Sequence, residues 1–219
     1  MKFFEHAGVK IEWLGHDAFR INYTKTIYID PFKISGGEKA DFILITHEHF
    51  DHCSPEDINK VVKNDTIIFV TPDCLSRMSR YVKDGKTVVV SPGQKIKIAT
   101  DIILEAVPAY NTNKFRSPGM PFHPKGNDWV GYILHLGKTK IYHAGDTDFI
   151  PEMRNIDVDI AMLPVSGTYV MTADEAIRAA KEMKAKYIIP MHYGEVVGSP
   201  EDAEKIKNAL PNVIILEKV

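Results

Sequence analysis

The sequence is poor in cysteine, because Cys53 and Cys74 are its only two among 219 residues. Two cysteines cannot form a disulfide framework or a cysteine-rich zinc module, so both are excluded. No apolar run approaches the roughly 18 residues that a membrane span needs. The opening residues, MKFFEHAGVKIEW, lack the apolar core of a signal peptide. We therefore expect a cytoplasmic protein.

The sequence also lacks an excess of positive charge. Lysine and arginine number 27 against 29 aspartates and glutamates, which gives a formal net charge of −2. No basic field is present to attract nucleic acid or an anionic membrane, so neither partner is expected. Hydrophobic residues make up 44% and charged residues 26%, which excludes wholesale disorder. The length suits one domain spanning 1–219 with a sizeable core.

Segments typical of strands and helices alternate along the chain. Apolar runs rich in β-branched and aromatic residues predict strands, two of them (66–71 and 87–91) buried. Helix-start signals occur at Ser54, and at Thr172 with Glu175, which form a capping box. The segment 129–146 predicts a hairpin that turns near Gly137. Further strands are expected at 9–14, 19–24, 26–32, 42–46, 95–100, 102–110, 156–167, 186–194 and 212–219, and helices at 54–64, 73–85, 172–184 and 199–210.

The two halves of the chain, roughly 1–105 and 106–219, follow a similar order of elements. Each half begins with hairpins, then alternates strands with helices, and contains the tetrapeptide Ser-Pro-Glu-Asp opening a helix. The tetrapeptide is a good helix start and can recur by coincidence. Together with the alternation, it favours two pseudo-repeated α/β halves whose sheets pack face to face with helices outside.

The segment from about Asn111 to Asp128 interrupts this regular pattern with prolines and glycines. A loop of this length in a compact domain is typically a functional lid or a disordered segment. Its Lys114, Arg116 and Lys125 either contact an anionic substrate or are solvated loop charges.

Nine histidines stand against the two cysteines. Three of them lie in the six-residue motif His47-Glu48-His49-Phe50-Asp51-His52, directly after an apolar run. Imidazole and carboxylate groups are ligands of zinc and its first-row neighbours. A solvated polar turn is the alternative, but three histidines in six positions rarely arise by chance. The helical zincin motif is excluded, because Asp51 stands where that motif needs its second histidine.

Three further metal-ligand candidates occur in related places. Asp146 and His192 each follow an apolar strand, and His123 lies in the long loop after the strand that ends near Pro108. Side chains that follow separate strands can converge at one edge of a sheet, where α/β proteins usually place their sites. The recurrence of this placement favours one shared metal site.

These motifs resemble the signature of the metallo-β-lactamase superfamily: H-x-H-x-D-H after a strand, a distant histidine, a G-D-T aspartate and a late histidine. The segments GHDAF, YIDPF, HAGDTD and PMHYG are similar to a branch of small metal-dependent hydrolases that includes ascorbate-6-phosphate lactonase-like proteins. The resemblance implies an α/β (α+β) fold, a four-layer αββα sandwich of the metallo-β-lactamase type. It also implies a dinuclear metal site.

The resemblance implies a ligand set for two metal ions. The first ion would be held by His47, His49 and His123, the second by Asp51, His52 and His192, and Asp146 would bridge both. His143 competes with His123, because His123 lies about 15 residues beyond its strand and His143 lies just before Asp146. The alternative role of His143 is a packed histidine or one that supports a ligand.

Two more motif residues have open roles. Asp30 in YIDPF matches an aspartate that supports a ligand in the family, and it equally suits the start of a turn before Pro31. His16 in GHDAF lines the pocket or has a structural role.

The implied activity is hydrolysis of a small ester, lactone or related substrate by a hydroxide bridging two divalent metal ions. Asp51 would hold its metal ion and accept a hydrogen bond from that nucleophile. The ions are expected to be Zn²⁺, and Mn, Fe or Ni also suit such ligands. The alternatives are a phosphodiesterase or nuclease on the same fold, and a non-hydrolytic di-metal redox or binding protein. The expected partner is a small-molecule substrate, an anionic one if the loop cations contact it.

Overall fold

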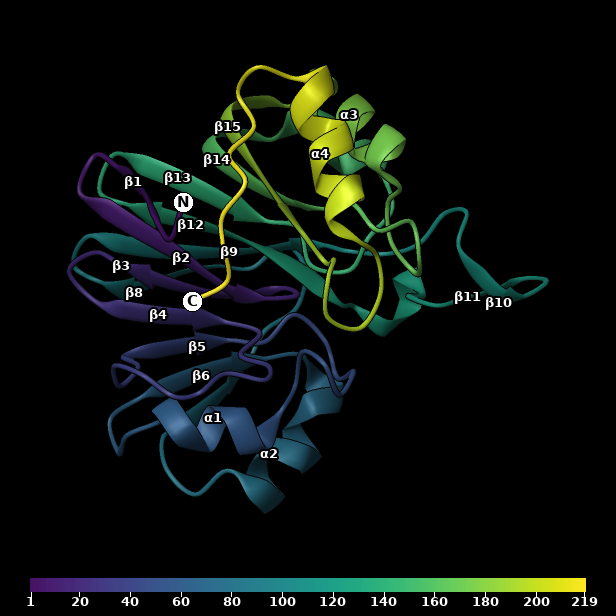
Figure 1. Cartoon of the computed structure of the whole chain (residues 1–219). Helices are drawn as coiled ribbons and strands as arrows, with labels where there is room; N and C mark the ends of the chain where they lie inside the picture. The colour runs from purple at the N-terminus through teal and green to yellow at the C-terminus, as the bar shows by residue number, and fades with distance from the viewer. The chain divides into compact units, whose positions relative to one another are not determined.

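Two mixed β-sheets contain most of the strands of the protein, in a computed structural model that describes residues 1–219 (Figure 1). Each sheet belongs to a separate unit of the chain. Unit 1 comprises Met1–Ser91 together with Leu216–Val219, and unit 2 comprises Pro92–Ile215. The predicted internal repeat of the halves 1–105 and 106–219 stays a prediction.

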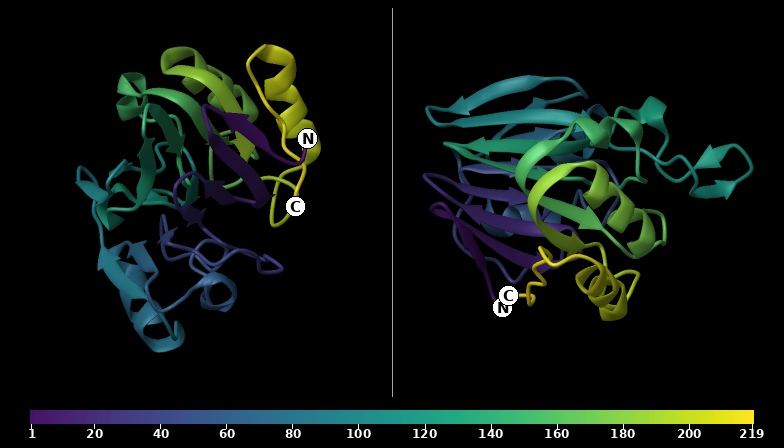
Figure 2. Two further views of the ribbon diagram at one scale, coloured as in Figure 1. Left: turned by 90° about the vertical axis from the view of Figure 1, so that its left-hand side faces the viewer. Right: turned by 90° about the horizontal axis from the view of Figure 1, so that it is seen from above.

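The sheet of unit 1 has seven strands arranged in sequence order. Its strands are β1 (Phe4–His6), β2 (Val9–Gly15), β3 (Ala18–Asn22), β4 (Thr26–Ile29), β5 (Phe42–Leu44), β6 (Ile67–Val70) and β7 (Lys86–Val89). The strands β1 to β4 pair antiparallel, and β4 to β7 pair parallel. The termini lie side by side in this unit, where Glu217 N donates to Met1 O at 2.8 Å (Figure 2).

The helices of unit 1 are α1 (Pro55–Val61) and α2 (Leu75–Tyr81), the latter preceded by the short 3₁₀ helix η1 (Pro72–Cys74). Ser54 caps α1 as predicted, because its side chain accepts a hydrogen bond from Asp57 N. Ile58 of α1 and Met78 of α2 belong to one buried cluster with Ile43 of β5 and Ile68 of β6. This apolar packing holds α1 against the sheet directly after the histidine-rich loop that follows β5.

The sheet of unit 2 has six strands in the order β15-β14-β13-β12-β9-β8. Their bounds are β8 (Lys95–Ala99), β9 (Ile102–Pro108), β12 (Val130–Leu136), β13 (Thr139–His143), β14 (Asp157–Pro164) and β15 (Lys184–Met191). The first four strands in chain order pair antiparallel, and β13, β14 and β15 pair parallel. The predicted hairpin turn is confirmed, because Leu136 of β12 pairs with Thr139 of β13.

The helices of unit 2 are α3 (Ala173–Glu182) and α4 (Pro200–Ala209), with the 3₁₀ helices η2 (Lys125–Asn127) and η3 (Pro151–Asn155). The predicted capping box of Thr172 and Glu175 begins α3. Figure 1 shows α3 and α4 beside β14 and β15. None of the helices in the protein has the length and apolar character needed to cross a membrane.

The structure corrects three sequence predictions. The predicted buried strand 87–91 corresponds to β7, whose residues are exposed because it is the edge strand of its sheet. The segment 212–219 forms no regular strand, since Ile214 N donates to Ile188 O in unit 2 whereas Val219 N donates to Trp13 O in unit 1. The loop 111–128 contains a small hairpin, β10 (Phe115–Ser117) with β11 (Met120–Pro121), which extends away from the sheet of unit 2 (Figure 2).

Candidate metal centre

The histidine motif of unit 1 occupies one tight turn between β5 and α1. The backbone N–H groups of His52 and Cys53 both donate to His49 O, at 3.1 and 2.8 Å. This turn brings the imidazole rings together: the ring centroids of His47 and His52 lie 4.0 Å apart, and those of His47 and His49 lie 4.6 Å apart. The short loop therefore gathers its histidines within one unit, as the sequence predicts.

Asp30, which follows β4, orients two of these histidines. Its Oδ2 atom accepts hydrogen bonds from His52 Nδ1 at 2.8 Å and from Thr46 Oγ1 at 2.6 Å. Because the Thr46 hydroxyl donates to Asp30, it accepts from His47 Nδ1, which lies 2.9 Å away. Both rings thus keep Nε2 for another partner, the arrangement found behind metal-bound histidines. Asp30 has φ +44°, a strained conformation consistent with a functional position.

His16 orients Asp51, the aspartate of the motif. His16 Nε2 lies 3.1 Å from Asp51 Oδ2, and the His16 ring is fully buried. Its backbone has φ +52°, and Trp13 Nε1 donates to its carbonyl oxygen at 2.8 Å. The structure therefore gives His16 a positioning contact with a motif carboxylate.

Asp17 is a neighbouring residue that sequence reasoning missed. Its side chain is fully buried, and its Oδ2 atom lies 3.6 Å from His52 Nε2. The potential ligand atoms of His16, Asp17 and His52 lie within 4.8 Å of one another. A single aspartate in a turn is so common that the sequence offered no signal for this contact.

In unit 2, Asp146 lies between two histidines. Its Oδ2 atom is 3.1 Å from His123 Nε2 and 3.2 Å from His192 Nε2. Asp146 follows β13 and His192 follows β15, both of which run parallel to β14. The carboxyl ends of parallel strands meet at one edge of a sheet, so the convergence has the origin that the sequence predicts.

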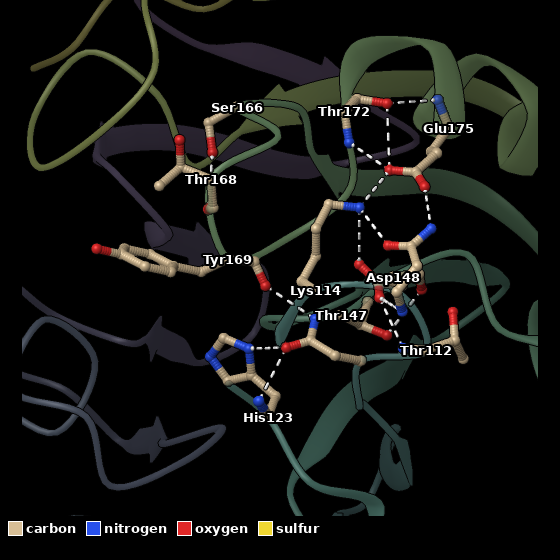
Figure 3. A network of polar contacts seen from close by, with 12 residues as sticks. Thr112, Lys114, His123, Thr147, Asp148, Ser166, Thr168, Tyr169, Thr172 and Glu175 are labelled. Carbon is tan, nitrogen blue, oxygen red and sulfur yellow. Dashed lines mark hydrogen bonds and ion pairs between the residues drawn. The ribbon is translucent and has the colours of Figure 1, made fainter. Parts of the chain in front are cut away.

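Two polar side chains orient the histidines of unit 2. Asn111 Oδ1 accepts from His123 Nδ1 at 2.9 Å, and Ser166 Oγ lies 2.9 Å from His192 Nδ1. Ser166 Oγ donates to the carbonyl of Thr168 (Figure 3). It therefore accepts from His192. Each ring therefore directs Nε2 towards Asp146. Neither Asn111 nor Ser166 belongs to a recognisable motif, so sequence reasoning missed both.

The competing histidine, His143, has a different environment. It is fully buried on β13 opposite Tyr132, and its Nδ1 atom accepts from Gly145 N at 3.2 Å. Within unit 2, His123 has a ring nitrogen beside Asp146, and it stays the predicted third histidine ligand of the first ion.

The contacts of the loop cation Lys114 differ from those of a solvated charge, one of its two predicted roles. Its Nζ atom lies 2.8 Å from Glu175 Oε2 and 3.3 Å from Asp148 Oδ1, and its side chain is only 16% exposed (Figure 3). Asp148 Oδ2 also accepts from the backbone N–H groups of Thr112 and Asn113. Lys114 is thus not a solvated loop charge, because its ion pairs anchor the base of the loop to α3.

This anchor perturbs the ionisation of Glu175. Burial raises the pKa of its carboxyl group, but hydrogen bonds from Lys114, Thr172 N and Asn113 outweigh burial and lower the pKa to about 2. The other two loop cations are exposed: Lys125 pairs with Glu152 at 3.1 Å, and Arg116 lies over the ring of Phe122.

Comparison with known proteins places these features in a family. The model of the beta-lactamase superfamily domain matches residues 10–192. A UPF0173 metal-dependent hydrolase of Thermoplasma acidophilum is 32% identical over 228 residues, covering 96% of this chain and 96% of that protein. The chain belongs to the UPF0173 metal-dependent hydrolase family of this superfamily. The lactonase-like branch stays a prediction.

Solved structures extend the comparison to the fold. The crystal structure of a candidate metal-dependent hydrolase from Parabacteroides distasonis has a TM-score of 0.81 and 34% identity, covering 98% of both chains. A metallo-beta-lactamase fold protein of Bacillus subtilis has a TM-score of 0.71 at 13% identity, covering 98% of this chain and 92% of that chain. The predicted fold class is confirmed.

Proposed function

We propose that this family member binds two divalent metal ions and hydrolyses a small ester, lactone or related substrate. One observation carries the proposal: four candidate histidines have Nδ1 engaged by a partner within their own unit. The pairs are His47 with Thr46, His52 with Asp30, His123 with Asn111, and His192 with Ser166. Because the engaged Nδ1 directs Nε2 to a second partner, the four rings are preorganised as metal ligands.

The proposed ligand set is the one that the resemblance to the superfamily implies. We assign His47, His49 and His123 to the first ion, Asp51, His52 and His192 to the second, and Asp146 to both. The set of imidazoles and carboxylates, without thiolates, suits Zn²⁺ and also accommodates Mn, Fe or Ni. Cys53 does not join it, because Cys53 Sγ packs against Met78 Sδ in the core of unit 1.

The bound ions would lower the pKa of a coordinated water and polarise the substrate oxygen that gains charge. Asp51 accepts a hydrogen bond from the attacking water at its carboxylate, and His16 holds that carboxylate through Nε2. Asp30 keeps the rings of His47 and His52 in place throughout, so little reorganisation is needed. No serine or cysteine nucleophile is required.

The substrate is proposed to be a small molecule. The chain carries a net charge of −2, which does not favour a nucleic acid. Lys114 and Lys125 are both engaged in ion pairs, so the exposed Arg116 is the loop cation that we assign to an anionic substrate group.

Metal analysis of the purified protein, followed by a panel of lactones, carboxylic esters, thioesters and phosphodiesters, tests the proposal. We expect two ions per chain and turnover of lactones or esters. His47→Ala should lower the metal content, whereas His135→Ala, which removes a histidine paired with Glu105, should not. Wild-type protein that binds no ions after metal loading would overturn the proposal, and turnover of phosphodiesters alone would replace it with the phosphodiesterase alternative.

A further inference from the structure

Asp17 is a fully buried carboxylate outside the ligand set proposed above. It lies in the two-residue turn between β2 and β3, after His16, whose carbonyl is held by Trp13. Burial of an ionised carboxylate is costly unless a cation or hydrogen-bond donors compensate. A metal ion is one such cation, and Asp17 belongs to a cluster of potential ligand atoms with His16 and His52.

The distance between the side chains of Asp17 and His52 suits two ligands of one metal ion. His52 Nδ1 is engaged by Asp30, so its Nε2 atom faces Asp17, whose Oδ2 atom lies 3.6 Å away. Two donors that share one zinc-like ion, each about 2.0–2.2 Å from it, lie no more than about 4.4 Å apart. The separation of Asp17 Oδ2 and His52 Nε2 is within this limit, and both atoms belong to unit 1.

We propose that Asp17 is a ligand of the metal ion that His52 binds. The inference rests on the proposed function, since it presumes that His52 is a metal ligand. With Asp51, Asp17 would give this ion two carboxylate ligands from unit 1. Carboxylates suit harder ions such as Mn²⁺, whereas imidazoles suit Zn²⁺. The metal site that contains His52 should therefore accept Mn²⁺ more readily than the site that contains His47 and His49.

The test compares metal binding by the full chain of wild type and Asp17→Asn. Calorimetric titration of the metal-free proteins with Mn²⁺ should show that the variant loses about 10-fold or more in affinity for one ion. That ion is the one assigned to His52, and the ion assigned to His47, His49 and His123 should bind as in wild type. After Co²⁺ loading, the visible absorption spectrum of Asp17→Asn should differ from that of wild type, because the spectrum depends on the ligands of the ion.

Glu12→Gln is the matched control. Glu12 lies on β2, is also buried, and pairs with Arg20 at 2.6 Å and with Lys10 at 2.8 Å. Neutralising it removes a buried, paired carboxylate from the same hairpin without touching the histidine motif. We expect lower stability, with wild-type Mn²⁺ affinities and an unchanged Co²⁺ spectrum.

Asp17→Glu is the second test variant, to be used if Asp17→Asn fails to fold. It keeps the carboxylate but moves it by one methylene, so it should retain the ion and alter the Co²⁺ spectrum. Unchanged affinities and spectra in the folded Asp17 variants would overturn the assignment and leave Asp17 as an ion-pair partner of His52 only. That result would leave the proposed function intact, whereas wild type that binds no ion would defeat the proposed function itself.

Discussion

Asn111 holds His123 at two points: its Oδ1 atom accepts from the backbone N–H of His123 at 2.8 Å and from the ring Nδ1 at 2.9 Å. The same amide donates through Nδ2 to Tyr169 O at 2.8 Å. Because the amide is anchored at three points, the ring of His123 has one orientation, with Nε2 beside Asp146.

Replacement of Asn111 by alanine should therefore weaken metal binding while leaving every proposed ligand in place. Loss of a partner behind a metal-bound histidine typically lowers affinity by about 10- to 100-fold. Competition titration with a chromophoric chelator measures the change. Asn127→Ala, at an exposed position of η2, is the control and should bind as wild type. Equal affinity of Asn111→Ala and wild type would show that His123 needs no such support.

Thr46→Val should remove the support of His47 while leaving that of His52, the two histidines that Asp30 orients. Valine keeps the shape of threonine but removes the hydroxyl that connects Asp30 to His47. The direct contact between Asp30 and His52 remains. We expect weaker binding of the ion assigned to His47 and near wild-type binding of the other, as measured by calorimetry.

Asp30→Ala should affect both ions and the fold. Asp30 is fully buried and accepts hydrogen bonds from Thr46 N, Thr46 Oγ1 and His52 Nδ1, so its loss leaves buried donors without partners. The free energy of unfolding should fall by about 3 kcal/mol. Urea denaturation measures the loss, with Thr46→Ser, which keeps the hydroxyl, as the mild control. A stability within error of wild type would contradict this account.

The low pKa of Glu175 predicts a pH dependence of stability. Its pKa is about 2 in the folded protein against a usual value of 4.5. The ionised Glu175 carboxylate therefore contributes fully to the free energy of unfolding above about pH 4.5, and this contribution is lost as the pH falls towards 2. Urea midpoints of wild type and Glu175→Gln should differ most near neutral pH and converge on acidification. A difference that stays constant from pH 7 to pH 2.5 would rule out this ionisation as the cause.

Metal removal should destabilise the protein. An ion at 100 times its dissociation constant stabilises the folded state by about 2.7 kcal/mol. For a chain of this size, chelation should lower the melting temperature by about 5–10 °C, as measured by calorimetry. His192→Ala should reduce this difference, because one proposed ligand is missing. An identical melting temperature of wild type with and without chelator would argue against a stably bound ion.

The helix starts were predictable from the sequence because they depend on residues that are neighbours along the chain. Ser54 caps α1 and Thr172 with Glu175 begins α3, since caps depend on residues within one helical turn. The approach of His192 to Asp146 was also predictable, because both follow strands of one sheet.

The remaining contacts join residues that are distant in sequence. Lys114 reaches Glu175, 61 residues away, and Asn111 reaches Tyr169, 58 residues away. No periodicity or spacing encodes such pairs. The exposure of β7 was missed for a related reason, since its apolar composition does not reveal that it is an edge strand.

The sequence by itself determined the chemical types of the proposed metal ligands, the position of the histidine motif and the succession of strands and helices, because these depend on residue chemistry and local backbone preference. Only the tertiary structure decided how the ligands are held. Asp30 reaches His52 across 22 residues, and Asp17 approaches the same ring from a separate turn. These polar contacts exist only once the sheet has brought distant turns to one edge, so their geometry is a property of the folded chain.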